Sequence, residues 1–410
     1  VGAGAAYTSA GIPLVGPCEV MPSGGFVNTD RTQILRDVMA GLLSLSWRQW
    51  TAVRSWARRH DAGGAVMLLV GDVVPLLLAS AAGENIPFAF VGCAKSEHYA
   101  RDPERTGHDT RPWIERVLSP SCVYFPWERA FLASPNCQLV APRDQLTSAS
   151  LRDALPHKAR CKVMYLGNPM MDGLEPARID FKNYLRSLSS GGVCMVLLPG
   201  TRQPEVYSNW NLILEAAASV VQHLPSPRRP FVFVAPVPES LSLATLSQSA
   251  IDQGWESVAS QYDSRLDTDQ PDSLSEYIPC TSKYGKVRPV SRLVIVRGYY
   301  NECIHSASAA IAMAGTATEQ VVGLGLPAFV IPGQGPQFTP EFARLQGLLL
   351  GKSVIFCSRP VDVGSMVPQV LHDQKRLETI RENGANRMGS PGSSKRIATE
   401  IMSRLVLKSE

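Results

Sequence analysis

The chain has 410 residues, of which 45% are hydrophobic and 19% charged, a balance typical of a folded globular protein and not of a disordered one. Its formal net charge is +4, and it contains no long run of lysine or arginine, which argues against a nucleic-acid-binding protein. No uninterrupted apolar run reaches the roughly 18 to 20 residues needed to cross a bilayer. The length suffices for two domains, each with its own core.

The nine cysteines are scattered along the chain, and no two of them form a Cys-x-x-Cys pair. This spacing supports neither a zinc site nor a redox motif. Most of the cysteines stand among apolar residues, which favours buried thiols in a reducing compartment.

The first third of the chain alternates between predicted strands and helices. Residues 1–30 are rich in glycine and proline and read as loops joined by short strands, and 31–59 has the apolar periodicity of a helix. Residues 65–71 and 87–92 are buried strands, with a helix predicted over 74–82 between them. This alternation predicts a parallel, doubly wound sheet.

Asp72 stands at the carboxyl end of the first buried strand, where open α/β sheets bind ligands. It is our candidate general base, although its position also suits an N-cap of the next helix. Residues 94–116 are polar and irregular and predict a long loop. Its Lys95, Glu97 and His98 are candidates to meet an acceptor substrate.

Leucine and tryptophan crowd residues 40–50. Core packing explains this composition directly. The alternative is a segment that rests on a membrane surface to reach a lipid acceptor.

A second α/β unit follows a predicted linker at 175–192, which ends in Ser-Ser-Gly-Gly. A buried strand is predicted at 193–198, a helix at 205–221, and a polar excursion at 252–289. Arg202 follows the first strand of this unit within Pro-Gly-Thr-Arg. It is a candidate to bind phosphate through two parallel hydrogen bonds, or else forms a surface ion pair.

The most informative stretch is 311–320, in which a short apolar run ends at Gly315-Thr316 and a helix begins. The turn would offer backbone N–H groups of Gly315, Thr316 and Ala317 to an anion at a helix N-terminus, with phosphate as the natural guest. Glu319 would then accept hydrogen bonds from ribose hydroxyls. The alternative is an ordinary helix start, capped by Thr316 with Glu319 as its capping-box partner.

A glycine- and proline-rich loop follows the next strand and carries two amides, Gln334 and Gln337. They are candidates to bind sugar hydroxyls, and a plain polar loop is the alternative. Gly200, in the loop after strand 193–198, would let the backbone approach a ligand closely.

Several of these segments resemble one family. Leu197-Leu198-Pro199-Gly200-Thr201-Arg202 is similar to the loop that opens the C-terminal domain of lipid-A-disaccharide synthases, and Gly315-Thr316-Ala317-Thr318-Glu319 resembles their nucleotide-sugar motif, with Glu319 one residue early. The similarity extends to the lipid-A-disaccharide-synthase-related proteins of cyanobacteria and plastid-bearing organisms through residues 11–17, 22–26, 167–174 and 335–338.

The resemblance implies an α/β protein of the GT-B class, with two Rossmann-like, doubly wound parallel-sheet domains facing a cleft. The expected divisions are an N-terminal domain at 1–174, the linker at 175–192, a nucleotide-sugar-binding domain at 193–385, and a C-terminal loop and helix at 386–410 that packs back on the N-terminal domain. The expected binding residues are Gly200, Thr201, Arg202, Gly315, Thr316, Ala317, Thr318, Glu319, Gln334 and Gln337.

The implied activity is metal-independent transfer of a hexose or N-acetylhexosamine from a UDP-sugar to a lipid-like acceptor, with no cofactor. The expected setting is the cytoplasm or the plastid stroma, with a peripheral membrane contact and a homodimer both left open. The synthases carry two neighbouring carboxylates where this chain has Asp72 alone. A UDP-sugar epimerase or hydrolase of the same fold, or a non-catalytic scaffold, therefore remains as an alternative.

Overall fold

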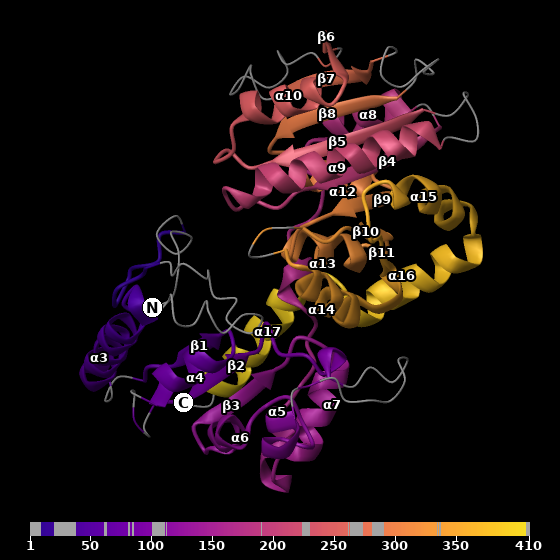
Figure 1. Ribbon diagram of the computed structural model, residues 1–410. Helices are drawn as coiled ribbons and strands as arrows, with labels where there is room; N and C mark the ends of the chain where they lie inside the picture. The colour runs from indigo at the N-terminus through magenta and orange to yellow at the C-terminus, as the bar shows by residue number, and fades with distance from the viewer. Residues whose placement is uncertain are drawn as a thin grey trace. The chain divides into compact units, whose positions relative to one another are not determined.

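The computed structural model describes residues 10–19, 38–60, 64–80, 83, 86–100, 111, 113–189, 191–223, 230–260, 262, 274–280, 291–333, 335 and 338–406. The chain divides into two compact units. Unit 1 comprises Val1–Pro169 and Gly392–Glu410, and unit 2 comprises Met170–Pro391. Each unit has its own sheet (Figure 1).

The sheet of unit 1 is parallel, in the order β1-β2-β3, where β1 is Met67–Val70, β2 is Phe88–Val91 and β3 is Cys137–Ala141. Apolar side chains on these strands pack into two core clusters, one of them with residues of the surrounding helices. The helical elements are α3 (Leu42–His60), α4 (Val73–Ser80), η1 (Glu97–Tyr99), α5 (Trp113–Leu118), α6 (Pro126–Ala133), α7 (Gln145–Ala154) and η2 (His157–Lys162).

The end of the chain completes unit 1. Helix α17 (Ser393–Ile401) and the π-helix η6 (Met402–Val406) lie against β3, and Ile397 is buried together with Val91 and Leu139. The Arg396 Nε donates to the carbonyl of Leu166 at 2.9 Å. In Figure 1 the yellow α17 accordingly lies among the indigo and purple elements of this unit.

Unit 2 contains an eight-stranded sheet in the order β11-β10-β9-β4-β5-β8-β7-β6. Its strands are β4 (Val193–Leu198), β5 (Phe231–Val237), β6 (Trp255–Val258), β7 (Leu274–Pro279), β8 (Arg292–Arg297), β9 (Ala309–Ala312), β10 (Ala328–Val330) and β11 (Val354–Phe356). Among the described strands of this sheet, the pairs β6–β7 and β7–β8 are antiparallel and the other pairs are parallel. The central strands are almost wholly buried apolar runs, as a parallel sheet covered on both faces requires.

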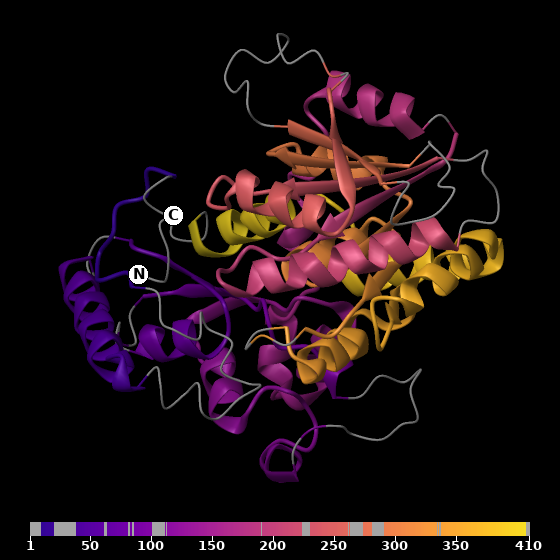
Figure 2. The ribbon, with the colours of Figure 1, turned by 45° about the horizontal axis from the view of Figure 1, so that its top comes forward.

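Helices cover the sheet of unit 2. They are η3 (Pro169–Met171) at the boundary, α8 (Ile179–Ser189), α9 (Glu205–Gln222), α10 (Leu243–Asp252), α12 (Tyr300–Ser306), α13 (Thr316–Gly323), α14 (Pro340–Leu350), η5 (Gly351–Ser353), α15 (Asp362–His372) and α16 (Gln374–Met388). Helix α9 packs along α15, as Figure 2 shows.

Two expectations about unit 2 need correction. The segment 175–192 is not a bare linker, because it contains α8, whose Phe181 and Leu185 are fully buried and anchor it to the sheet. The segment 252–289 is not wholly an excursion, since it contributes β6 and β7 at the sheet edge, and Trp255, the first residue of β6, is buried. Both were missed because their apolar residues are few and separated by polar ones.

Within the described part of the chain, no helix is both long enough and apolar enough to cross a membrane.

Candidate functional site

The strands β10, β9 and β4 of unit 2 are parallel neighbours, so the loops that follow them share one edge of the sheet. Leu198, the last residue of β4, pairs with Ala312, the last residue of β9. Ala312 pairs in turn with Val330, the last residue of β10. We call the loops 199–202, 313–315 and 331–333 the three-loop edge. It includes the Pro-Gly-Thr-Arg and Gly-Thr segments that the sequence singled out.

The first two loops touch through their backbones. Gly200 has a φ of +90°, and a Cβ built on it would lie 3.3 Å from the carbonyl oxygen of Met313. Since any side chain would be strained at this φ, glycine is what permits the close approach. Thr201 is exposed and Arg202 is partly exposed, so both side chains of this loop are reached by solvent.

The turn after β9 leads directly into α13. Its N-cap residue is Gly315, which has no side chain with which to cap the helix. The capping-box alternative is therefore wrong, since Thr316 is the first helical residue and is exposed. The N–H groups of Thr316 and Ala317 lie in the first turn, where the helix has no carbonyl to offer them. Glu319 is partly exposed on the same turn.

Thr318 is a correction to the predicted binding set. Its side chain is fully buried, and its hydroxyl donates to the carbonyl of Ala314 at 2.6 Å. It supports the turn from within and cannot reach a ligand. Gln334 and Gln337 lie outside the described residues, so their predicted contact with a sugar stays a prediction.

Two buried amides support the three-loop edge, and the sequence analysis missed both. The Gln346 Nε2, from α14, donates to the carbonyls of Ala314 at 2.9 Å and Gly315 at 3.3 Å. The Asn209 Nδ2, from α9, donates to the carbonyl of Pro199 at 3.1 Å. The remaining oxygens of these two amides are buried and accept no hydrogen bond within the described structure. The sequence did not indicate them, because a glutamine or asparagine in a helix has the same local pattern whether its side chain is buried or exposed.

The loop after β10 is held by Glu205, the first residue of α9. Its Oε1 accepts a hydrogen bond from the N–H of Phe338 at 2.7 Å, and the N–H of Gly333 donates to the carbonyl of Phe338 at 2.9 Å. All three loops thus rest on residues of α9 and α14. The edge is a backbone surface fixed by these hydrogen bonds, and Arg202 stands in the first of its three loops.

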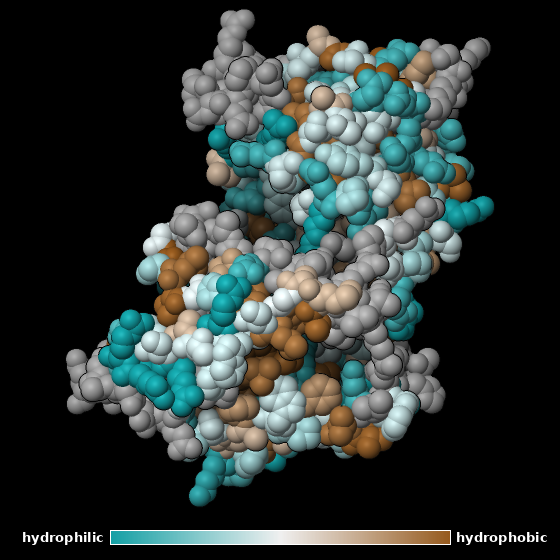
Figure 3. Space-filling model, turned by 60° about the vertical axis from the view of Figure 1, so that its left-hand side comes forward, coloured by the Kyte–Doolittle hydropathy of each residue, from teal (hydrophilic) through white to brown (hydrophobic). Residues whose placement is uncertain are grey.

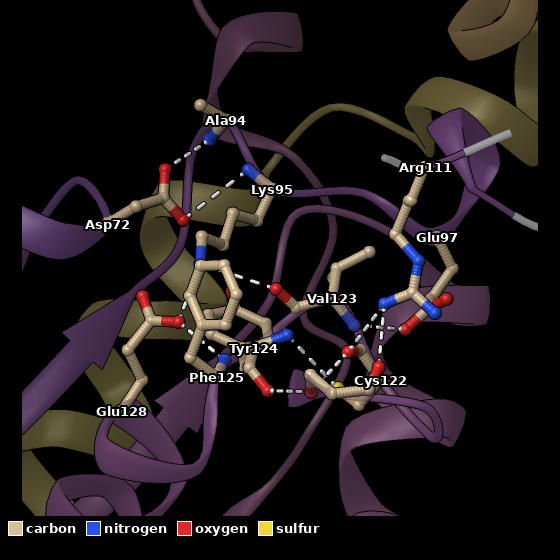
Figure 4. A network of polar contacts seen from close by, with 11 residues as sticks. Asp72, Ala94, Lys95, Glu97, Arg111, Cys122, Val123, Tyr124, Phe125 and Glu128 are labelled. Atoms are coloured by element: carbon tan, nitrogen blue, oxygen red, sulfur yellow. Dashed lines mark hydrogen bonds and ion pairs between the residues drawn. The ribbon is translucent and has the colours of Figure 1, made fainter. Parts of the chain in front are cut away.

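Unit 1 carries a second polar cluster, at the carboxyl ends of β1 and β2 (Figure 4). Asp72 follows β1, and its Oδ2 accepts from the N–H of Ala94 at 2.7 Å while its Oδ1 accepts from the N–H of Lys95 at 3.4 Å. Burial raises the pKa of Asp72, and these two hydrogen bonds, with the charges of Lys95 and Arg143, oppose that rise. The carboxyl group is thus better suited to accept a proton near neutral pH than an exposed aspartate is.

Gly92 lets the backbone after β2 pass close to the Tyr124 hydroxyl, next to Asp72. A Cβ there would lie 2.5 Å from the Tyr124 hydroxyl and 3.7 Å from the Asp72 Oδ1. Tyr124 is fully buried, and its hydroxyl has no hydrogen-bond partner among the described residues. The Arg143 Nη1 donates to the carbonyl of Cys93 at 3.0 Å and so brings the loop after β3 to the same cluster.

Lys95 and Glu97 do not extend toward an acceptor, contrary to our expectation. The Lys95 Nζ lies 2.5 Å from the Oε2 of the fully buried Glu128 and 4.5 Å from the centre of the Phe125 ring. The Glu97 Oε1 accepts from the N–H of Val123 at 2.7 Å, as Figure 4 shows. The segment contains the short helix η1, whose polar side chains satisfy buried groups.

His98 is mostly buried as well, with its Nε2 3.9 Å from the Asp144 Oδ1. Among the described residues there is no group of three or more His, Cys, Asp or Glu side chains that could hold a metal ion.

Comparison with known proteins supports the fold. No protein-family model and no curated protein matches the chain. Among solved structures it is similar to a putative UDP-N-acetylglucosamine 2-epimerase from Listeria monocytogenes, with a TM-score of 0.51, 13% identity, and coverage of 90% of this chain and 81% of that one. It is similar to S. aureus MnaA, solved with UDP, with a TM-score of 0.51, 13% identity, and coverage of 90% and 83%.

A third similar structure is the UDP-GlcNAc 2-epimerase of Neisseria meningitidis bound to UDP-GlcNAc, with a TM-score of 0.51, 12% identity, and coverage of 97% of this chain and 87% of that one. At such identities the likeness speaks for the fold alone. Together with the two α/β units, it assigns the chain to the GT-B fold with two Rossmann-like units.

Proposed function

We propose that the protein is an enzyme acting on a UDP-sugar, and that the three-loop edge of unit 2 binds the diphosphate. The observation that carries the proposal is the meeting of the loops after β4 and β9, where Gly200 approaches Met313 and Arg202 stands in the same loop. A guanidinium and an uncapped helix N-terminus beside each other are a recurrent arrangement for phosphate. Similar structures solved with UDP and with UDP-GlcNAc share the fold.

The chemistry assigns a role to each accessible group. When the bond from the sugar to the diphosphate breaks, UDP leaves with the electron pair, and negative charge grows on its phosphate oxygens. Arg202 and the N–H groups of Thr316 and Ala317 stabilise that charge, and removing one such donor typically costs about 100- to 1,000-fold in rate. Glu319 accepts hydrogen bonds from the ribose hydroxyls.

The finer proposal is transfer of a hexose or N-acetylhexosamine to the hydroxyl of a lipid-like acceptor, without a metal ion. The acceptor oxygen forms a bond to the anomeric carbon, and its proton passes to Asp72. Burial, which raises the pKa of Asp72, supports this role. The acceptor class rests on the resemblance of the sequence to lipid-A-disaccharide synthases.

The second candidate is a UDP-sugar epimerase. The observation in its favour is that the similar structures from L. monocytogenes and N. meningitidis are described as UDP-GlcNAc 2-epimerases. The two reactions separate in one assay, since an epimerase converts UDP-GlcNAc into its 2-epimer with no acceptor present. A transferase leaves the nucleotide sugar intact until an acceptor hydroxyl is supplied.

Binding of UDP tests the shared part of both candidates. Isothermal titration with UDP, UDP-glucose and UDP-GlcNAc should give a dissociation constant for the native protein. Arg202→Ala should weaken it about 10- to 100-fold, since a hydrogen bond to a charged group contributes about 1.5–3 kcal/mol. Arg297→Ala, a change at the end of β8 in the same sheet, is the matched control.

If Arg202→Ala and Arg297→Ala bound UDP with equal affinity, the three-loop edge would not be the diphosphate site. Binding of UDP with neither transfer nor epimerisation would point instead to a non-catalytic scaffold.

A further inference from the structure

Helix α3 of unit 1 presents large apolar side chains to the surface. Leu43 is 69% exposed and Trp47 is 65% exposed, one helical turn apart. The Trp47 ring stacks on that of Trp50, with centroids 5.4 Å apart and an interplanar angle of 17°. Figure 3, which views the molecule from the side that carries α3, shows hydrophobic residues beside strongly hydrophilic ones on the lower part of the surface, which is unit 1.

The same helix face becomes basic toward its C-terminal end. Leu43, Trp47, Trp50, Arg54 and Arg58 are spaced by four, three, four and four residues, which aligns them along one face of a helix. The guanidinium carbon of Arg54 lies 5.1 Å from the centre of the Trp50 ring. Helix α3 contains no acidic residue, so nothing on it neutralises this face.

The opposite face of α3 attaches the helix to unit 1. Leu45 and Gln49 are buried there, and the Gln49 Nε2 donates to the carbonyl of Pro17 at 3.0 Å. Ala57, three residues after Arg54, is also buried, at the border of the basic face. The helix is therefore held without any help from Leu43 or Trp47.

We propose that this face of α3, comprising Leu43, Trp47, Trp50, Arg54 and Arg58, docks on an anionic lipid surface. Leucine and tryptophan would enter the boundary between head groups and acyl chains while the arginines contact lipid phosphates, the arrangement of an interfacial amphipathic helix. A second copy of the chain is a poorer occupant, because a symmetric contact would bring two unneutralised basic faces together.

This proposal adds a partner to the proposed function and is tested separately from it, since vesicle binding and UDP binding are independent measurements. The chain is sedimented with sucrose-loaded vesicles of phosphatidylcholine, with or without phosphatidylglycerol. It should bind the anionic vesicles and bind phosphatidylcholine alone at least tenfold more weakly. Added salt should reduce binding, because it screens the arginines.

Two variants divide the contributions. Arg54→Gln with Arg58→Gln should lower the partition coefficient on anionic vesicles about 30-fold, because each basic residue near such a surface contributes roughly fivefold. Its control is Lys375→Gln with Lys395→Gln, which removes the same charge from exposed positions on α16 and α17. An equal loss of the partition coefficient in both double variants would mean that only the net charge matters, and it would overturn the proposal.

Leu43→Ser with Trp47→Ser should lower vesicle binding at least tenfold, since each side chain would lose its apolar burial. The matched control is Trp113→Ser with Val117→Ser on α5, an equally exposed pair at the same spacing, 67% and 70% exposed. Quenching by brominated lipid should fall in Trp47→Phe and stay unchanged in Trp113→Phe.

Absence of vesicle binding by the native chain would refute the proposal. So would a concentration-dependent dimer, seen by light scattering, that Leu43→Ser with Trp47→Ser abolishes, since a second copy would then cover the face.

Discussion

Gln346 offers the sharpest test of how unit 2 builds its three-loop edge. Gln346→Met keeps the length and approximate volume of the side chain but removes the Nε2 donor. The carbonyls of Ala314 and Gly315 then lose the hydrogen bonds that fix the turn before α13. We expect the turn to relax and its N–H groups to lose their alignment.

The effect on stability should be modest. A buried acceptor left without a partner costs about 1–3 kcal/mol, but both carbonyls keep another donor, namely the Thr318 hydroxyl for Ala314 and the N–H groups of Thr318 and Glu319 for Gly315. Methionine also removes the unpartnered Oε1 of Gln346. A loss of about 1 kcal/mol should lower the melting temperature of a unit of this size by roughly 2–4 °C.

The effect on ligand affinity should be larger than the effect on stability. If the turn supplies N–H groups to a phosphate, losing one charged hydrogen bond weakens UDP binding about 10- to 100-fold. Isothermal titration measures this, and urea denaturation measures the stability of the same samples.

Asn383→Leu is the matched control for Gln346→Met. Asn383 is also a buried amide of unit 2, and its Nδ2 donates to the Leu350 carbonyl at 2.7 Å, at the C-terminal end of α14, and to the Ser353 hydroxyl at 2.7 Å. It should cost a similar amount of stability and leave UDP affinity unchanged. Equal UDP affinity in Gln346→Met and the native chain, or equal losses in both variants, would refute the reasoning.

Three further predictions concern single sites. Burial raises the folded pKa of Asp72, so its contribution to stability is greatest below the unfolded value of roughly 4 and declines as pH rises through the folded pKa. In urea denaturation, the free energy of unfolding of the native chain should therefore fall relative to that of Asp72→Asn as pH increases. Lys95→Met should cost about 3–5 kcal/mol by leaving Glu128 as a buried unpaired charge, and adding Glu128→Gln should recover most of it, whereas a loss of acceptor affinity alone would contradict this. Gly200→Ala should cost about 1–3 kcal/mol and weaken UDP binding, since φ is +90° and the new methyl group presses on Met313; an unchanged melting curve would argue against the strain.

Local signals predicted much of the framework. Continuous apolar runs such as 193–198 identified the buried strands, and the glycine at 315 marked the start of α13. The linker prediction for 175–192 was wrong, because Phe181 and Leu185, the two buried residues that anchor its helix, give a weaker signal than the Ser-Ser-Gly-Gly at its end. A Gly/Ser run indicates a flexible backbone at its own position, but it does not indicate whether the residues before it are buried in a core.

The polar residues of unit 1 show where sequence reasoning fails. Lys95 and Glu97 lie in a stretch that reads as a solvated loop, yet their partners, Glu128 and Val123, come from more than twenty residues further along. A charged side chain is buried or exposed according to whether a distant group can pair with it, and no local pattern records that.

Amino-acid order by itself predicted the parallel strands at the centre of each sheet, but not the antiparallel β6 and β7 at the edge of unit 2. It also predicted that Gly200 and Gly315 stand in turns, because strand burial and backbone freedom are properties of short segments. Only the tertiary structure decided that those two turns are neighbours, since the strand order β10-β9-β4 depends on which strands pair. It alone also assigned Gln346 and Asn209 as supports of the three-loop edge, because a buried amide is defined by the carbonyl it reaches across the fold.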